Sequence, residues 1–136
     1  MLELTQESRT IAGIVLLTVV TIEFGGTYLL RVARGQVPLT EFQTNFHRAG
    51  HAHAGVLVTL GLVGIILADA TGLEGILGWI ARAGVPISAI FIPAGFFLSS
   101  LGKNVTRPNG LIVLLWIGTV FLAVGTLTLG IGLLTA

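Results

Sequence analysis

Cysteine is absent from this chain of 136 residues, and charged residues make up only 10% of it. Without cysteine there are no disulfides, no thiolate metal ligands and no cysteine nucleophiles. Soluble domains carry about 25% charged residues, and a share of this size is unusually low for a soluble domain. Together with a hydrophobic content of 54%, it places the chain among integral membrane proteins.

Basic residues are also few, and they are scattered. The formal net charge is +1 and no run of lysine or arginine occurs. Nucleic-acid binding requires a clustered basic face, so this class of partner is excluded. The first residues lack the positive start of a signal peptide, and the apolar run behind them is too long for one. We therefore expect them to belong to the mature protein.

Four long apolar runs are present, and each is long enough to cross a bilayer. They predict an all-α, integral membrane four-helix bundle in which residues 1–136 form a single domain. We therefore expect the protein to be embedded in a lipid bilayer, which is its main partner. The predicted spans cover residues of about 11–32, 46–68, 85–101 and 111–134.

Local signals refine these spans. Thr44 or Asn45 is a candidate N-cap for the second span, and Pro93 should kink or break the third. Residues 71–82 suit either a short interfacial helix or the first turns of the third span, because tryptophan is favoured at headgroup depth. Gly118 and Gly125 lie a heptad apart on one face of the fourth span and predict a packing stripe. So small and glycine-rich a bundle also suggests a homo-oligomer or a larger membrane complex.

The distribution of basic residues orients the spans. Four spans put both termini on one side, where only Arg9 and Arg82 are basic. By the positive-inside rule, both termini should lie outside a bacterial or archaeal plasma membrane. The cytoplasmic loops would then carry most of the basic residues: Arg31, Arg34, Arg48, Lys103 and Arg107.

All three histidines open the second span, at positions 47, 51 and 53. His47 and His51 are four residues apart, so their imidazoles stack one turn apart and can chelate one metal ion. His53 lies about 160° round the helix from His51 and should serve a separate partner. Ionisable residues inside a membrane are candidates for function, although interhelical hydrogen bonding alone is the alternative interpretation.

Glu23 lies near the middle of the first span, where an unpaired carboxylate is costly. We expect it to face the bundle interior, at about the level of His53, and to act as an oxygen ligand with His47 and His51. Further polar residues should reach the same end of the bundle and could form a pocket there, unless the serines bond to their own helix: Ser99, Ser100 and Asn109.

The stretch Ala52-His53-Ala54, followed by an apolar helix, resembles the start of the second helix in the catalytic subunit of haem-copper oxidases. The resemblance covers about a dozen residues of one helix. It implies that His53 is an axial ligand of a haem. The family's second axial histidine and its copper ligands have no counterpart, because no histidine lies outside residues 47–53.

These observations support three hypotheses about function. The first is a site for haem b or for a transition metal (Cu, Fe or Zn), with redox chemistry, oxygen chemistry or metal handling around it. The second is a proton-coupled small transporter or channel that uses Glu23 and the histidines as a relay. The third is an accessory subunit of a larger membrane complex. The sequence leaves open whether the protein is an enzyme.

Overall fold

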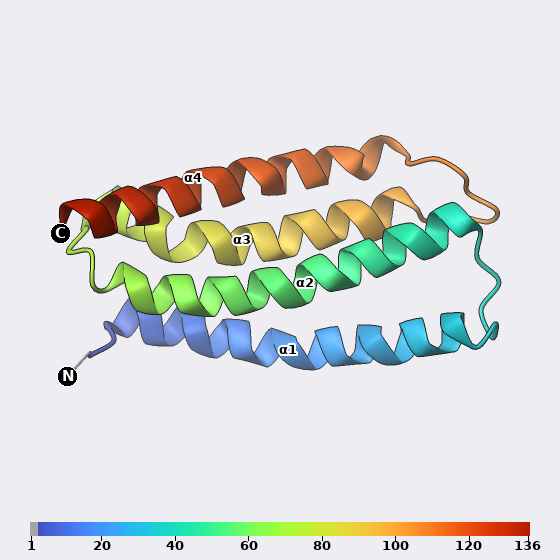
Figure 1. Ribbon diagram of the computed structural model, residues 1–136, viewed down its shortest axis with the longest axis horizontal. Coiled ribbons are helices and arrows are strands. Elements are labelled where there is room, and N and C mark those ends of the chain that lie inside the picture. The colour runs from blue at the N-terminus through green and yellow to red at the C-terminus, as the bar shows by residue number, and fades with distance from the viewer. Residues whose placement is uncertain (1–2) are drawn as a thin grey trace.

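The computed structural model describes residues 3–136 and consists of four long helices that run alternately up and down (Figure 1). Each helix is long and apolar enough to cross a membrane, so the predicted all-α membrane bundle is confirmed. A short 3₁₀ turn, Gly110–Ile112, precedes the last helix. The helices are α1 (Gln6–Ala33), α2 (Glu41–Ala68), α3 (Gly75–Ser99) and α4 (Val113–Thr135).

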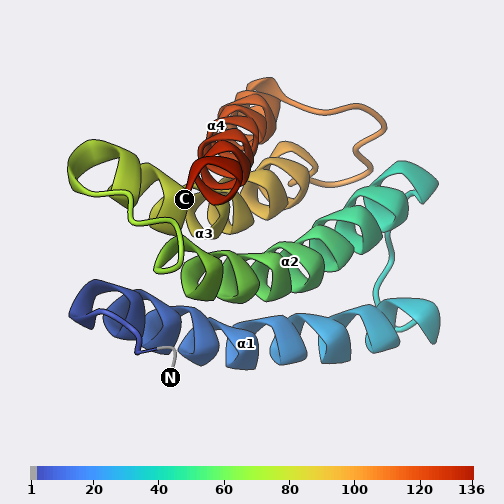
Figure 2. The same ribbon diagram turned by 60° about the vertical axis from the view of Figure 1, so that its left-hand side comes forward.

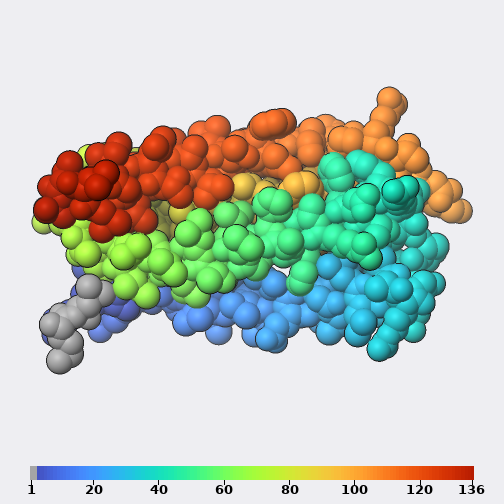
Figure 3. Space-filling view, viewed as in Figure 1, coloured from blue at the N-terminus to red at the C-terminus, as the bar shows by residue number. Residues whose placement is uncertain are grey.

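The helices pack in chain order, with α2 and α3 in the middle (Figures 1 and 2). Among the described residues, α1 and α4 do not contact each other, and α1 touches α3 only slightly. In the space-filling view, α2 and α4 cover most of α3 (Figure 3). The outer helices therefore present most of their surface to the bilayer, and α2 and α3 are the more enclosed helices.

Glycine allows α3 and α4 to approach closely. A Cβ atom added at Gly84 would lie 2.6 Å from Cα of Gly125, and one added at Gly118 would lie 2.6 Å from the Ile92 side chain. Small residues at these points let the two backbones pack directly against each other. The predicted packing stripe of Gly118 and Gly125 is confirmed, since both residues are buried against α3.

The second helix begins earlier than predicted. Its N-cap is Thr40, whose side chain accepts from the backbone N–H of Gln43 while the Gln43 side chain accepts from the Thr40 backbone. This reciprocal capping box satisfies N–H groups at the helix start. The expected cap at Thr44 or Asn45 was therefore wrong, because the local Thr-x-x-Gln pattern starts the helix about one turn before the apolar run.

Residues 75–82 form the first turns of α3, which decides between the two predicted alternatives. Pro86 and Pro93 both lie inside this helix, which continues through them. The expected break at Pro93 therefore does not occur. Pro86 packs beside Gly61 of α2, and the Pro93 side chain is buried.

A buried ionic network joins three helices at the end where both termini lie (Figure 1). Asp69, the C-cap of α2, forms an ion pair of 2.9 Å with Arg82 of α3, and their side chains are only 3% and 13% exposed. Ser8 donates to the same carboxylate at 2.8 Å, and the backbone N–H of Thr5 donates at 2.9 Å. This network fixes the start of α1 against α2 and α3.

Candidate functional site

The three histidines lie in the first half of α2, at the end of the bundle that carries both long loops (Figure 1). Basic residues of the α1–α2 and α3–α4 loops share this end. The loops are held close to the helices. Gln43 donates to the carbonyl oxygens of Ser100 and Gly102 at 3.0 and 2.9 Å, and Thr40 donates to that of Val105. The histidine region is therefore built on an ordered scaffold.

His47 is buried between α1 and α3. A hydrogen bond of 3.0 Å joins its Nδ1 atom and the hydroxyl of Tyr28, with the donor set by the imidazole tautomer. The imidazole also lies against the Phe97 ring, with 5.4 Å between the ring centroids. One nitrogen of His47 is therefore hydrogen-bonded to α1, and the ring is enclosed by its neighbours.

His51 lies one turn further along, against the part of α1 where two glycines follow each other. A Cβ atom added at Gly25 would lie 3.3 Å from Nδ1 of His51, and one at Gly26 would lie 3.5 Å from its Cε1. A side chain at Gly25 would therefore crowd the imidazole slightly, whereas one at Gly26 would make ordinary contact with it. Among residues 3–136, hydrogen bonds hold His47 and His53 but none holds His51.

His53 occupies a different face of α2 and is exposed on the chain surface. Its Nδ1–H donates to the carbonyl oxygen of Ala49 at 2.8 Å, and its ring packs against Phe96 with centroids 5.1 Å apart. A carbonyl oxygen can only accept, so Nδ1 of His53 is the nitrogen that carries the donated proton. In the neutral imidazole Nε2 then has a free lone pair, and a ligating histidine commonly has this arrangement, with its other N–H bonded to a carbonyl oxygen.

The predicted division of the histidines between two faces agrees with these contacts. His47 and His51 both lie against α1, through Tyr28 and the glycine pair. His53 instead contacts Ala49 of its own helix and Phe96 of α3. The two-residue step from His51 to His53 turns the side chain away from α1, as helix geometry requires.

The expectation that Glu23 faces the interior was wrong. Glu23 is exposed on α1, and no group of three or more His, Asp or Glu side chains able to hold a metal ion occurs within residues 3–136. The contacts of Tyr28 with His47 and of Gly25 with His51 show how α1 and α2 run past each other. Further back along α1 in the same alignment, Glu23 lies at the level of His53, but on another face of α1.

The expected polar pocket also does not form. The hydroxyls of Ser99 and Ser100 donate to carbonyl oxygens one turn back in α3, at Phe96 and Phe97. Asn109 donates to the carbonyl oxygen of Leu98 and accepts from the N–H of Leu111. These side chains complete the end of α3 and the start of the 3₁₀ turn, so they are not available to orient a histidine.

Sequence reasoning missed the aromatic partners of the histidines. Tyr28, Phe96 and Phe97 each contact an imidazole. A signal for Tyr28 was present, because a tyrosine hydroxyl inside a membrane helix needs a polar partner. Comparison of the chain with family models, curated proteins and solved structures finds no match.

Proposed function

We propose that this integral membrane protein binds haem through His53 and takes part in redox or oxygen chemistry. The observation that carries the proposal is the hydrogen bond from His53 Nδ1–H to the Ala49 carbonyl oxygen at 2.8 Å. That bond fixes the ring and leaves Nε2 free to ligate iron. The exposure of His53 on the chain surface supports access to this nitrogen.

The number of available ligands favours haem over a bare metal ion. Zinc sites take three or four protein ligands, whereas no three-ligand group occurs in residues 3–136. Haem brings four ring nitrogens of its own and needs only one or two axial ligands from protein. Bound haem would supply one-electron chemistry, and His53, oriented by its hydrogen bond to the Ala49 carbonyl oxygen, would be the residue that holds it.

Because a single chain offers one such histidine, we propose that His53 of a second copy, or a ligand from a larger membrane complex, completes the site. Most homo-oligomers have closed symmetry, most often a twofold axis, and the same surface patch of both copies meets at such an interface. The apolar surface beside His53, including exposed Val56 and Leu60 on α2, suits either arrangement. Both partners would lie within the bilayer.

The proposal is tested on protein purified in detergent from cells supplied with a haem precursor. We expect a Soret band and one haem for every one or two chains. His53→Ala should lose the band, whereas His51→Ala, a matched change in the same helix, should keep it.

Two results would overturn the proposal. Stoichiometric Cu, Fe or Zn without a Soret band would favour a metal site at His47 and His51. Wild-type protein that carries neither haem nor metal under these conditions would remove the cofactor hypothesis and favour an accessory role.

A further inference from the structure

A long groove opens between α1 and α3, with α2 as its floor. It has a volume of about 440 Å³, within the range of about 300–1,000 Å³ that is typical of small-molecule sites. The groove exists because α1 packs on α2 and barely touches α3. Its length follows α1 from Ile11 to Gly25, a helical rise of about 21 Å.

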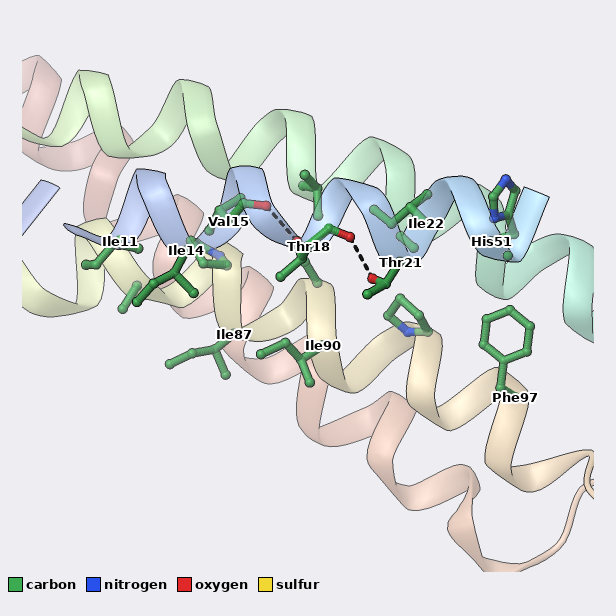
Figure 4. Close-up of a pocket in the computed structure, with 17 residues that line it drawn as sticks. Ile11, Ile14, Val15, Thr18, Thr21, Ile22, His51, Ile87, Ile90 and Phe97 are labelled. Atoms are coloured by element: carbon green, nitrogen blue, oxygen red, sulfur yellow. Dashed lines mark hydrogen bonds between the residues drawn. The ribbon is translucent and has the colours of Figure 1, made fainter. Parts of the chain in front are cut away.

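The lining of the groove is apolar and contains no charged side chain. Two threonines of α1 line it, but their hydroxyls are already used. Thr18 donates to the carbonyl oxygen of Val15 and Thr21 to that of Thr18, each at 2.6 Å (Figure 4). A charged ligand would therefore find no counter-ion here, and its desolvation would be costly.

His51 is the exception in this lining. In Figure 4, His51 and Phe97 lie at one end of the groove, and Ile11 and Ile14 lie at the other. His51 is half-buried, its ring lies beside Gly25 and Gly26, and it has no hydrogen-bond partner among residues 3–136. A polar group without a partner in an apolar setting costs free energy, which a ligand can recover.

The depth of His51 narrows the class of ligand. The helical rise from Glu41 to His51 is about 15 Å, and α2 as a whole is about 42 Å long against a hydrocarbon core of about 30 Å. With α2 centred in the bilayer, His51 lies about 9 Å inside the hydrocarbon boundary. A phospholipid headgroup stays at the interface and does not reach this depth.

We propose that the groove binds an elongated apolar molecule whose neutral carbonyl or hydroxyl headgroup forms a hydrogen bond with His51. Alkyl or isoprenyl quinones and long-chain alcohols share this chemistry. The chain lies along the isoleucine-rich part of the groove, and the headgroup lies between His51 and Phe97. This site is separate from His53, which occupies another face of α2.

Calorimetric titration tests the proposal on the full chain, without haem, in phosphatidylcholine nanodiscs. The probes are a benzoquinone with a ten-carbon alkyl chain, decanol and decanoate. We expect saturable binding of the quinone or of decanol, and whichever of the two binds shows whether the headgroup is a carbonyl or a hydroxyl. Decanoate should bind at least tenfold more weakly than that probe. Because haem is absent, this result is independent of the function proposed for His53.

Four variants locate the site. His51→Leu should weaken binding of the preferred neutral probe about tenfold, the equivalent of one hydrogen bond, and His51→Gln should retain part of it. Ala54→Phe, which fills the groove, should abolish binding. Ala123→Phe, the matched change on the exposed surface of α4, should leave binding unchanged.

Three results would overturn the proposal. Uptake that does not saturate and is equal in all variants means simple partition into lipid. Preference for decanoate means that the headgroup is anionic. A dimer that Ala54→Phe dissociates, with no probe bound by the wild type, means that a second copy occupies the groove.

Discussion

The Tyr28 hydroxyl lies 3.0 Å from Nδ1 of His47 and joins α1 to α2 near the loop end of the bundle. At the other end of α1, Ser8 and Thr5 bind the Asp69 carboxylate. Between these polar contacts, α1 packs on α2 through an apolar cluster that includes Val15, Val58 and Ile65. The first helix is thus held at both ends by hydrogen bonds, while its contact with α3 stays slight enough to leave a groove.

Tyr28→Phe should lower the free energy of unfolding in detergent by about 1 kcal/mol, because the buried His47 loses its partner. A double-mutant cycle with His47→Leu should show a coupling energy of similar size. Thr27→Val is the matched control, since the exposed Thr27 hydroxyl bonds only to its own helix. A coupling energy near zero would contradict the role given to this hydrogen bond.

The Asp69 network predicts a loss of stability in acid. Burial alone raises the pKa of Asp69, but the hydrogen bonds from Thr5, Ser8 and Arg82 outweigh it and hold the pKa below its ordinary value of 3.8. A carboxylate with a lowered pKa in the folded state stabilises that state above its unfolded pKa. This stabilisation is lost as the pH falls through the lowered value.

Thermal unfolding between pH 7 and pH 3 measures this effect. The melting temperature of the wild type should fall at the acid end. Asp69→Asn should unfold at lower temperature at neutral pH, because Arg82 loses its counter-ion, and it should show a smaller further fall in acid. The exposed Glu74→Gln variant at the same end should keep the wild-type profile. An acid fall of equal size in Asp69→Asn would refute the assignment to Asp69.

Gly84→Ala should destabilise the contact between α3 and α4. Its new Cβ atom would lie 2.6 Å from the Gly125 backbone, and overpacking of this kind costs about 1–3 kcal/mol. Gly130→Ala on α4 is the control, since nothing lies within 4 Å of the added atom. Unfolding in a denaturing detergent measures both, and equal stability of the two variants would show that the close approach is unimportant.

Much of the fold could be predicted because hydrophobic run length is a strong signal in membrane proteins. The four spans follow from it, and the packing of Gly118 and Gly125 follows from their heptad spacing on one face of a helix. Helix ends are set by local chemistry instead. The Thr40–Gln43 capping box starts α2 within polar sequence, and an apolar run cannot mark that point.

The site was predicted less well, and the reason is geometric. Helical rise gives the position of a residue along the bundle axis, and it placed Glu23 and His53 at the same position along that axis. The face of α1 that meets α2 depends instead on how the two helices pack, through contacts such as Gly25 with His51. For the histidines the angles within one helix suffice, which is why the separation of His53 from His47 and His51 could be foreseen.

The same end of the bundle carries the histidines and most of the loop charge, so orientation can be tested directly. We expect both termini to lie outside and the α1–α2 and α3–α4 loops to lie in the cytoplasm, by the positive-inside rule. A reporter active only outside the membrane should work when fused after Ala136 and fail when inserted near Lys103. The reverse pattern would place the histidines towards the outer leaflet.

Haem titration into purified haem-free protein, followed by the absorbance of the Soret band, tests the central claim most directly. The account predicts saturable binding by the wild type and by His51→Ala. His53→Gly should bind weakly, and added imidazole should restore its spectrum by replacing the missing side chain. If His53→Gly binds haem as tightly as the wild type and gives the same spectrum without imidazole, His53 is not the ligand.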